Sequence, residues 1–216
     1  MDLAANPEEI VSEPEGQPLP PLLQALAEIL GRRQKDYPAV KAPSRRRAAG
    51  VLVLFYERHG ELYVVFFKRT EKVPTHKGQV AFPGGSGEEK DNDLMATALR
   101  EAQEELGIDP DRVLMIGPLK PFDTFVSNFV VSPFCGFLVD PEPVFTAQPF
   151  EVEEVMEIPV ARLRDKRNRH RGKVPGFNVP FPLPYYKIDD AIIWGATGGI
   201  VAGLLTALDE ADSAAS

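Results

Sequence analysis

Residues 98–107 read ALREAQEELG, a run in which a helical pattern and a cluster of acids coincide. On a helix, residues three and four positions apart share a face, so Glu101 lies beside Glu104 and Glu105. Aliphatic and small residues cover the opposite side and can anchor the helix in a core, and Gly107 stands where a C-terminal cap belongs. The pattern predicts a helix over 94–106 that presents three carboxylates together.

The three carboxylates repel one another, and each neighbouring pair costs roughly a few tenths of a kcal/mol on an exposed helix. A divalent cation removes that cost, and oxygen ligands suit Mg²⁺ or Mn²⁺ better than Zn²⁺. The alternative interpretation is a solvated acidic face that binds nothing. The turn Phe82-Pro83-Gly84-Gly85 favours the metal, because a glycine backbone lets a metal or a phosphate approach closely.

The segments around this helix alternate between strand and helix patterns. Strands are expected at 48–56, 62–67, 113–119 and 129–139, and helices at 21–33, within 150–164 and in the apolar segment 191–208. This order predicts one α/β domain with strands of mixed direction.

Composition divides the chain into four parts. Residues 1–18 are acidic and rich in proline, and we expect a disordered tail there. Residues 19–44 hold a helix and a basic link, 45–210 form the main domain, and 211–216 are expected to be a flexible C-terminus.

Charge and cysteine content limit the compartment and the partners. The 216 residues include 44% hydrophobic and 26% charged residues, which is typical of globular proteins. A net charge of -8 argues against nucleic acid or a membrane surface as a partner. Cys135 is the single cysteine, and residues 1–20 do not resemble a secretory signal. We therefore expect a cytoplasmic protein, either a monomer or a homodimer.

The run from Arg100 to Ile108 resembles the second half of the Nudix hydrolase signature, which reads Arg-Glu-aliphatic-x-Glu-Glu-x-Gly-aliphatic. The first half departs from that signature. The family has a Glu six positions after Gly85, where this chain has Asp91, and the spacing to Arg100 is one residue longer. Asp91, Glu88 and Glu89 are the candidate replacements. The resemblance implies a Nudix-type α/β/α sandwich with a mixed sheet, and hydrolysis of a nucleoside diphosphate linked to another group.

Upstream residues narrow the resemblance to the coenzyme A pyrophosphatase branch. The segment 65–70, Gly78 and the turn 82–85 keep the spacing of its motif, although Pro74 stands where the motif has a second Arg. The resemblance implies hydrolysis of coenzyme A or acyl-coenzyme A to 3′,5′-ADP and 4′-phosphopantetheine or its acyl form. The alternatives are another substrate, such as ADP-ribose, a dinucleotide or a nucleoside triphosphate, and a non-catalytic nucleotide-binding protein.

The same resemblance assigns roles to residues of the helix and its surroundings. It implies that Mg²⁺ or Mn²⁺ is held by Glu101, Glu104, Glu105 and the carbonyl of Gly85. The catalytic group comprises Glu101, Glu104, Arg100 and Glu151, in which Arg100 fixes a carboxylate rotamer. The general base stays open between Glu101, Glu151 and Glu154.

A 3′-phosphate on coenzyme A calls for further cations around the substrate. The candidate substrate-binding residues are Arg69, His76, Lys77, Gly78, Phe82 and Arg46. The basic segment 162–173 is expected to be a loop, and it is either a solvated hairpin, a phosphate contact or a nucleic-acid site. Trp194, Phe129 and Tyr185 either line a nucleotide or pantetheine pocket or pack in the core.

Overall fold

The computed structural model describes residues 18–34, 47–124, 128–176 and 180–215. Its centre is an antiparallel hairpin of β1 (Arg47–Arg58) and β2 (Glu61–Arg69), joined by a two-residue turn. Both strands are buried along most of their length. The strand pair expected from the β-branched runs is therefore confirmed.

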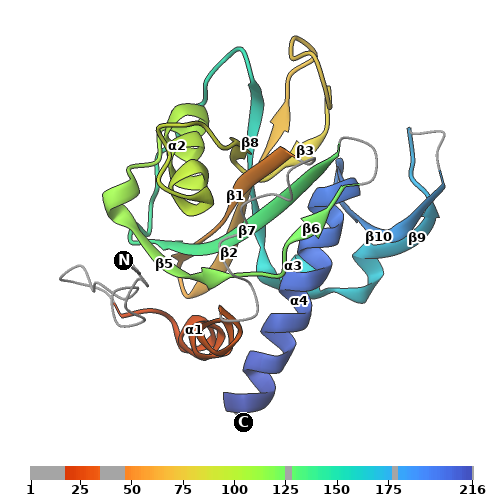
Figure 1. Cartoon of the computed structure of the whole chain (residues 1–216). Coiled ribbons are helices and arrows are strands. Elements are labelled where there is room, and N and C mark those ends of the chain that lie inside the picture. Colours follow the sequence, from red (N-terminus) through yellow and green to blue (C-terminus); the bar gives the residue numbers. More distant parts are fainter. Residues whose placement is uncertain (1–17, 35–46, 125–127, 177–179, 216) are drawn as a thin grey trace.

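An eight-stranded mixed sheet is built around this hairpin (Figure 1). β7 (Phe129–Leu138) runs parallel to β1, and β5 (Val113–Pro118) is antiparallel to β7. β8 (Val152–Pro159) pairs with β2. The remaining strands of the sheet are β3 (Val80–Ala81), β4 (Gly84–Ser86) and β6 (Phe122–Asp123).

Helices cover both faces of the sheet (Figure 1). α2 (Leu94–Leu106) packs on one face, while α1 (Pro21–Arg33) and α4 (Gly195–Ala215) pack on the other. Because successive strand residues point to opposite faces, β1 supplies Leu52 and Leu54 to one core and Val53 and Phe55 to the other. The expected α/β/α sandwich is confirmed.

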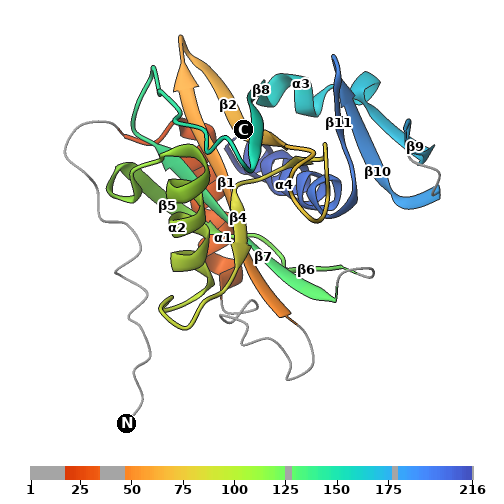
Figure 2. The same ribbon diagram turned by 90° about the horizontal axis from the view of Figure 1, so that it is seen from above.

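A second, three-stranded sheet lies beside the main one (Figure 2). It contains β9 (Arg169–Lys173), β10 (Pro180–Ile188) and β11 (Ala191–Ile193), and α3 (Val160–Arg164) leads into it from β8. Short 3-10 turns occupy Pro110–Arg112 and Lys166–Asn168. The segment 162–173, which we expected to be a loop, is therefore largely regular structure.

The segment 150–164 holds the expected short helix, which is α3 over 160–164. The residues before it form strand β8 over 152–159, because pairing with β2 decides their conformation. The last helix begins at Gly195, after β11. It continues through Ala215, where we expected a flexible end over 211–216, since Ala211 is fully buried in the core.

The predicted acidic tail and the basic link, with Arg46, fall on 1–17 and 35–46, outside the described residues. Within the part of the chain that the structure describes, no helix has both the length and the apolar character needed to cross a bilayer. The predicted domain boundaries stay predictions.

Candidate active site

The helix α2 matches the predicted bounds at both ends. Asp93 caps its N-terminus by accepting a hydrogen bond from the backbone N–H of Ala96. Gly107 caps its C-terminus in the left-handed conformation, with φ of 69°. Ala98, Ala102 and Leu106 are fully buried under the sheet. This packing fixes the direction in which the carboxylates of the same helix point.

Glu105 is the most buried of the three helix carboxylates, at 4% exposure. Its Oε2 accepts a 2.9 Å hydrogen bond from the backbone N–H of Gly84, and its Oε1 lies 4.0 Å from Arg69 Nη1. Burial raises the pKa of Glu105 to about 8, with help from the nearby charges of Glu101 and Glu151 and against the hydrogen bond from Gly84 and the charge of Arg69. The turn 82–85 therefore contacts the helix through a carboxylate that lacks a close cation.

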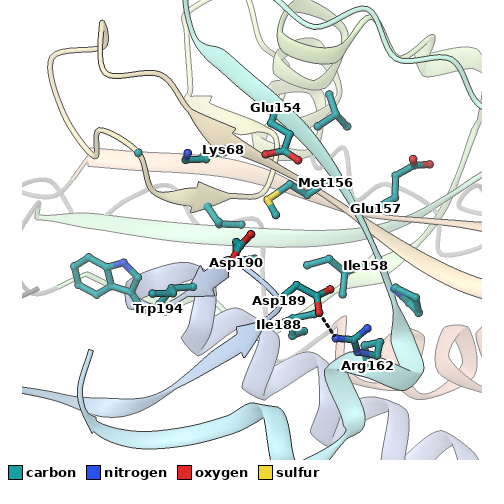
Figure 3. Close-up of a pocket in the computed structure, with 16 residues that line it drawn as sticks. Lys68, Glu154, Met156, Glu157, Ile158, Arg162, Ile188, Asp189, Asp190 and Trp194 are labelled. Carbon is teal, nitrogen blue, oxygen red and sulfur yellow. Dashed lines mark hydrogen bonds and ion pairs between the residues drawn. The ribbon is translucent and has the colours of Figure 1, made fainter. Parts of the chain in front are cut away.

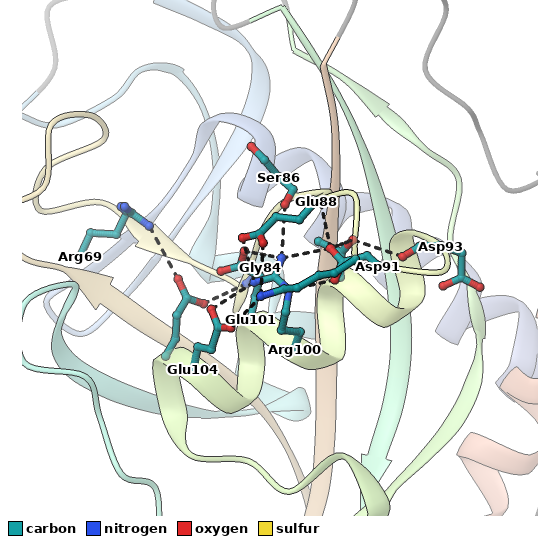
Figure 4. A network of polar contacts seen from close by, with 12 residues as sticks. Arg69, Gly84, Ser86, Glu88, Asp91, Asp93, Arg100, Glu101 and Glu104 are labelled. Carbon is teal, nitrogen blue, oxygen red and sulfur yellow. Dashed lines mark hydrogen bonds and ion pairs between the residues drawn. The ribbon is translucent and has the colours of Figure 1, made fainter.

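Glu101 lies next to the same turn (Figure 4). A Cβ at Gly85 would overlap the Glu101 carboxylate, so only glycine allows this approach. Burial raises the pKa of Glu101, although Arg100 at 3.0 Å opposes the shift. Glu104 differs, because its side chain is 54% exposed and pairs with Arg100 at 3.1 Å and Lys90 at 3.9 Å.

Asp91, one of the three candidate replacements for the first Glu of the signature, lies beside Arg100 (Figure 4). Its two oxygens accept hydrogen bonds from Arg100 Nε at 2.9 Å and Nη2 at 3.1 Å, and Thr97 Oγ1 donates to it at 2.8 Å. The Asp91 side chain is only 6% exposed, and the Arg100 guanidinium holds the pKa of this carboxyl well below its usual range. The loop before α2 is one residue longer than in the signature, and an Asp in this loop pairs with Arg100.

Arg100 connects the loop to the helix carboxylates. Besides Asp91, it contacts Glu101 and Glu104, and Glu88 lies 3.7 Å away. A planar guanidinium that is held on one side by Asp91 presents its remaining N–H groups in fixed directions. Arg100 therefore lies where it can hold carboxylates in position, and the orienting role that the resemblance implies stays a prediction.

Glu151 reaches the same cluster from a turn that precedes β8. Its carboxylate lies 3.8 Å from Arg69 Nη2, and its charge acts on both Glu101 and Glu105. The side chain is 39% exposed. Glu154, the other distant candidate for the general base, lines a separate pocket instead.

Gln148 holds the turn that carries Glu151, and the sequence analysis missed it. Its backbone N–H donates to the carbonyl of Glu105 at 2.8 Å. Its side-chain Oε1 accepts from the backbone N–H groups of Phe150 and Glu151, at 2.6 and 3.0 Å. One residue therefore connects the end of α2 to the turn of Glu151. The stretch Gln-Pro-Phe-Glu carries a turn signal, but no sequence pattern connects it to α2.

The candidate substrate residues do not all gather at the cluster. Arg69 lies between Glu105 and Glu151, and its buried Nε has no hydrogen-bond partner among the described residues. His76 and Lys77 are exposed in the loop 71–79. Phe82 is a correction, because it is 4% exposed and stacks on Phe66 in the core, with ring centroids 4.5 Å apart.

The donor chemistry fits a hard divalent cation. The charge of Glu151 lies close enough to raise the pKa of both Glu101 and Glu105, and glycine backbone adjoins these two side chains. As the side chains lie, however, the described residues contain no group of three acidic, His or Cys side chains arranged to hold an ion. Glu101 and Glu104 both turn toward Arg100, so metal binding requires them to exchange that partner.

Comparison with known proteins identifies the family. A family profile described as NUDIX domain matches residues 45–176. The chain belongs to the Nudix hydrolases. Enzymes of this family act on pyrophosphate bonds of nucleoside diphosphate derivatives and generally need a divalent cation. The family resemblance that the 98–107 run predicted is confirmed.

Two curated Nudix relatives resemble the chain in sequence, and one solved structure resembles it in fold. It is 35% identical over 184 residues to mitochondrial Nudix hydrolase 15 of Arabidopsis thaliana, covering 80% of this chain but only 63% of that protein. It is 32% identical over 195 residues to the uncharacterized Nudix hydrolase NudL of Pectobacterium atrosepticum, covering 85% and 94%. A MutT/nudix family protein from Enterococcus faecalis shares the fold at a TM-score of 0.53 and 16% identity, covering 85% and 70%.

The Arabidopsis relatives are named mitochondrial and chloroplastic. The expected cytoplasmic location therefore stays a prediction.

Proposed function

We propose that this Nudix hydrolase cleaves the diphosphate of coenzyme A or acyl-coenzyme A, yielding 3′,5′-ADP and 4′-phosphopantetheine or its acyl form. The observation that carries the hydrolytic part is the buried Glu105, which lies against Gly84 with Glu101, Glu151 and Arg69 around it. The coenzyme A part rests on the motif spacing from residue 65 to residue 85.

In this proposal Mg²⁺ or Mn²⁺ is held by Glu101, Glu104, Glu105 and the carbonyl of Gly85. When bound, such an ion neutralises phosphate charge and lowers the pKa of a coordinated water. Arg100 keeps Glu101 and Glu104 in position, because Asp91 fixes its guanidinium. The carboxylates that repel one another in the metal-free chain become the ligand set.

Arg69 and Glu151 act on the substrate and the attacking water. The Nη groups of Arg69 have only long contacts, at 3.8 and 4.0 Å, so the guanidinium is available to a diphosphate oxygen. Glu151 is exposed enough to meet water and accepts its proton as the oxygen attacks one phosphorus. The bond from that phosphorus to the bridging oxygen breaks, and the second phosphate leaves with the bridging oxygen.

A substrate without a 3′-phosphate, such as ADP-ribose or a dinucleotide, is the second candidate. Pro74 replaces a motif Arg, and His76 and Lys77 lie in an exposed loop, which leaves few described cations beside Arg69 for a third phosphate.

A substrate panel separates the two candidates. Coenzyme A, dephospho-coenzyme A, ADP-ribose and a dinucleotide are incubated with the protein and Mg²⁺ or Mn²⁺, and products are separated by chromatography. We expect the highest kcat/KM on coenzyme A and release of 3′,5′-ADP. Equal kcat/KM on coenzyme A and dephospho-coenzyme A contradicts 3′-phosphate recognition, and no hydrolysis of any diphosphate contradicts the proposed function.

A further inference from the structure

A pocket of about 490 Å³ lies on the face of the sheet opposite to α2 (Figure 3). The strands β2, β3 and β8 form one wall, and the β10–β11 hairpin with Trp194 forms the other. Met156, Ile158 and Ile188 supply an apolar floor that joins the core around α4. The volume falls in the range of pockets that hold small organic ligands.

The charges around this pocket are predominantly negative. Its lining includes the carboxylates Glu154, Glu157, Asp189 and Asp190, against the two cations Lys68 and Arg162. Both cations are already engaged, because Arg162 pairs with Asp189 at 2.9 Å and Lys68 pairs with Glu153 at 2.7 Å. Glu157 is engaged as well, by Arg58 at 2.8 Å, so Glu154 and Asp190 are the carboxylates that remain to face a ligand. An anionic phosphate is therefore repelled, whereas a neutral group that donates hydrogen bonds meets carboxylate acceptors.

The pocket and the carboxylate cluster share one strand end. Lys68 of β2 lines the pocket, and the next residue, Arg69, points to Glu105 on the opposite face. Val80 also lines the pocket, and the chain runs from it to Gly84 beside Glu105. The four residue steps from Val80 to Gly84 span at most about 14 Å. A substrate whose diphosphate lies at the cluster can therefore extend one arm into the pocket.

We propose that this pocket binds the pantetheine arm of the substrate, with its thiol or acyl end, and that the adenosine 3′-phosphate half lies outside it. The inference rests on the proposed function and deepens it. Charge decides the orientation, because the adenosine half carries an extra phosphate and the pantetheine arm is neutral. The amide N–H groups of the arm donate to Glu154 and Asp190, while its carbon chain packs on Met156 and the indole of Trp194.

Trp194 is the only tryptophan in the chain, so its fluorescence reports on this pocket alone. The full chain is titrated with pantetheine, which has no phosphate, and separately with 3′,5′-ADP, each with and without Mg²⁺. We expect pantetheine to change Trp194 emission saturably and 3′,5′-ADP to leave it unchanged. A response to 3′,5′-ADP, or no response to pantetheine, overturns the assignment.

A charged substitution on the pocket floor provides the second test. We expect Met156→Glu to raise the apparent Kd for pantetheine and the KM for coenzyme A by about tenfold, with kcat nearly unchanged. The reason is that the introduced carboxylate stays hydrated and does not pack against the carbon chain of the arm. The matched control is Val144→Glu, at an exposed position outside the pocket, and it leaves both values unchanged. Equal effects of the two variants contradict the proposal.

The titration measures binding without hydrolysis. It therefore separates the pocket assignment from the proposed function. Hydrolysis of coenzyme A without a Trp194 response to pantetheine overturns the pocket assignment alone. A Trp194 response without hydrolysis of coenzyme A overturns the proposed function and keeps the pocket as a binding site for the neutral arm.

Discussion

The two sides of the carboxylate cluster are held by different forces. On the helix side, which comprises α2 and the loop before it, Glu105 is 4% exposed and Arg100 forms a buried ion pair with Asp91. Burial and this ion pair hold the side chains in place. On the loop side, Glu151 is 39% exposed and is placed by backbone hydrogen bonds around Gln148. The helix side is held by buried contacts, whereas the loop side keeps one carboxylate in contact with water. A proton acceptor needs that access, and a metal ligand does not.

The largest effect is expected from a substitution of Glu105, the buried carboxylate on the helix side. We expect Glu105→Gln to lower kcat by about three orders of magnitude, because the ion loses a charged ligand at the reacting phosphates. The melting temperature at neutral pH stays near that of the parent chain, since a carboxyl with a pKa of about 8 is already largely protonated there in the metal-free protein. Substrate turnover and thermal unfolding are measured on the same samples.

The control for this variant is Glu89→Gln, which removes an exposed acid from the loop before α2. It leaves both kcat and the melting temperature near those of the parent chain. Full activity of Glu105→Gln would show that the helix side does not bind the ion, and the comparison between the two sides would fail.

A substitution of Asp91 tests whether the ion pair between Asp91 and Arg100 keeps the helix side rigid. We expect Asp91→Asn to lower kcat by about 10–100-fold and the free energy of unfolding by about 3 kcal/mol, because Arg100 loses its buried partner. Glu88→Gln is the matched control, because Glu88 faces the same Arg100 at 3.7 Å from a 52% exposed position. An exposed pair contributes about 1 kcal/mol or less. Equal losses in the two variants would contradict the role of burial.

The pH dependence of the Asp91 contribution has a defined sign. The folded pKa of Asp91 lies below its unfolded value near 4. The stabilisation is therefore complete above about pH 4 and is lost as the pH falls through the acid range. We expect the difference in melting temperature between the parent chain and Asp91→Asn to shrink below that pH.

The helix side was largely predictable because its geometry is local. The spacing of Glu101, Glu104 and Glu105 sets their shared face once α2 forms, and Gly107 marks its end. The identity of Arg100's partner was not predictable, since three acids lie in the longer loop. Burial beside Thr97 selects Asp91 in the structure, and no spacing rule states that.

The loop side and the second sheet depend on contacts between distant parts of the chain. Gln148 matters because it meets the carbonyl of Glu105, a partner that periodicity cannot show. Phe82 stands in the motif beside the metal turn, yet packing against Phe66 places it in the core. The acids of β8 lie in the segment that we expected to hold a helix, and pairing with β2 makes this part of it a strand. Long-range packing therefore decides what local pattern leaves open.

A substitution of Gln148 tests how the loop side holds Glu151. We expect Gln148→Ala to lower kcat about tenfold with little change in KM, because the turn of Glu151 loses its side-chain cap. In a Glu151→Gln background the same substitution changes kcat little, since both act through one carboxylate. Additive losses in the double variant would show that Gln148 acts on the end of α2 instead.

The last test is a pH slope in the stability of the metal-free chain. The folded pKa of Glu105 is about 8, against an unfolded value near 4.3. Between these values the folded state holds the proton more tightly, so this stabilisation is complete below about pH 4.3 and is lost as the pH rises toward 8. Glu105→Gln removes the slope, whereas Glu151→Gln keeps most of it, because burial of Glu105 is the largest cause of the shift.

Melting temperatures across pH 5–8, with and without Mg²⁺, measure this slope. The ion binds the charged carboxylates, so we expect it to raise the melting temperature more at pH 8 than at pH 5. A slope that persists in Glu105→Gln but vanishes in Glu151→Gln would move the perturbed carboxylate to the loop side. The assignment of ligand and proton acceptor would then have to be exchanged between the two sides.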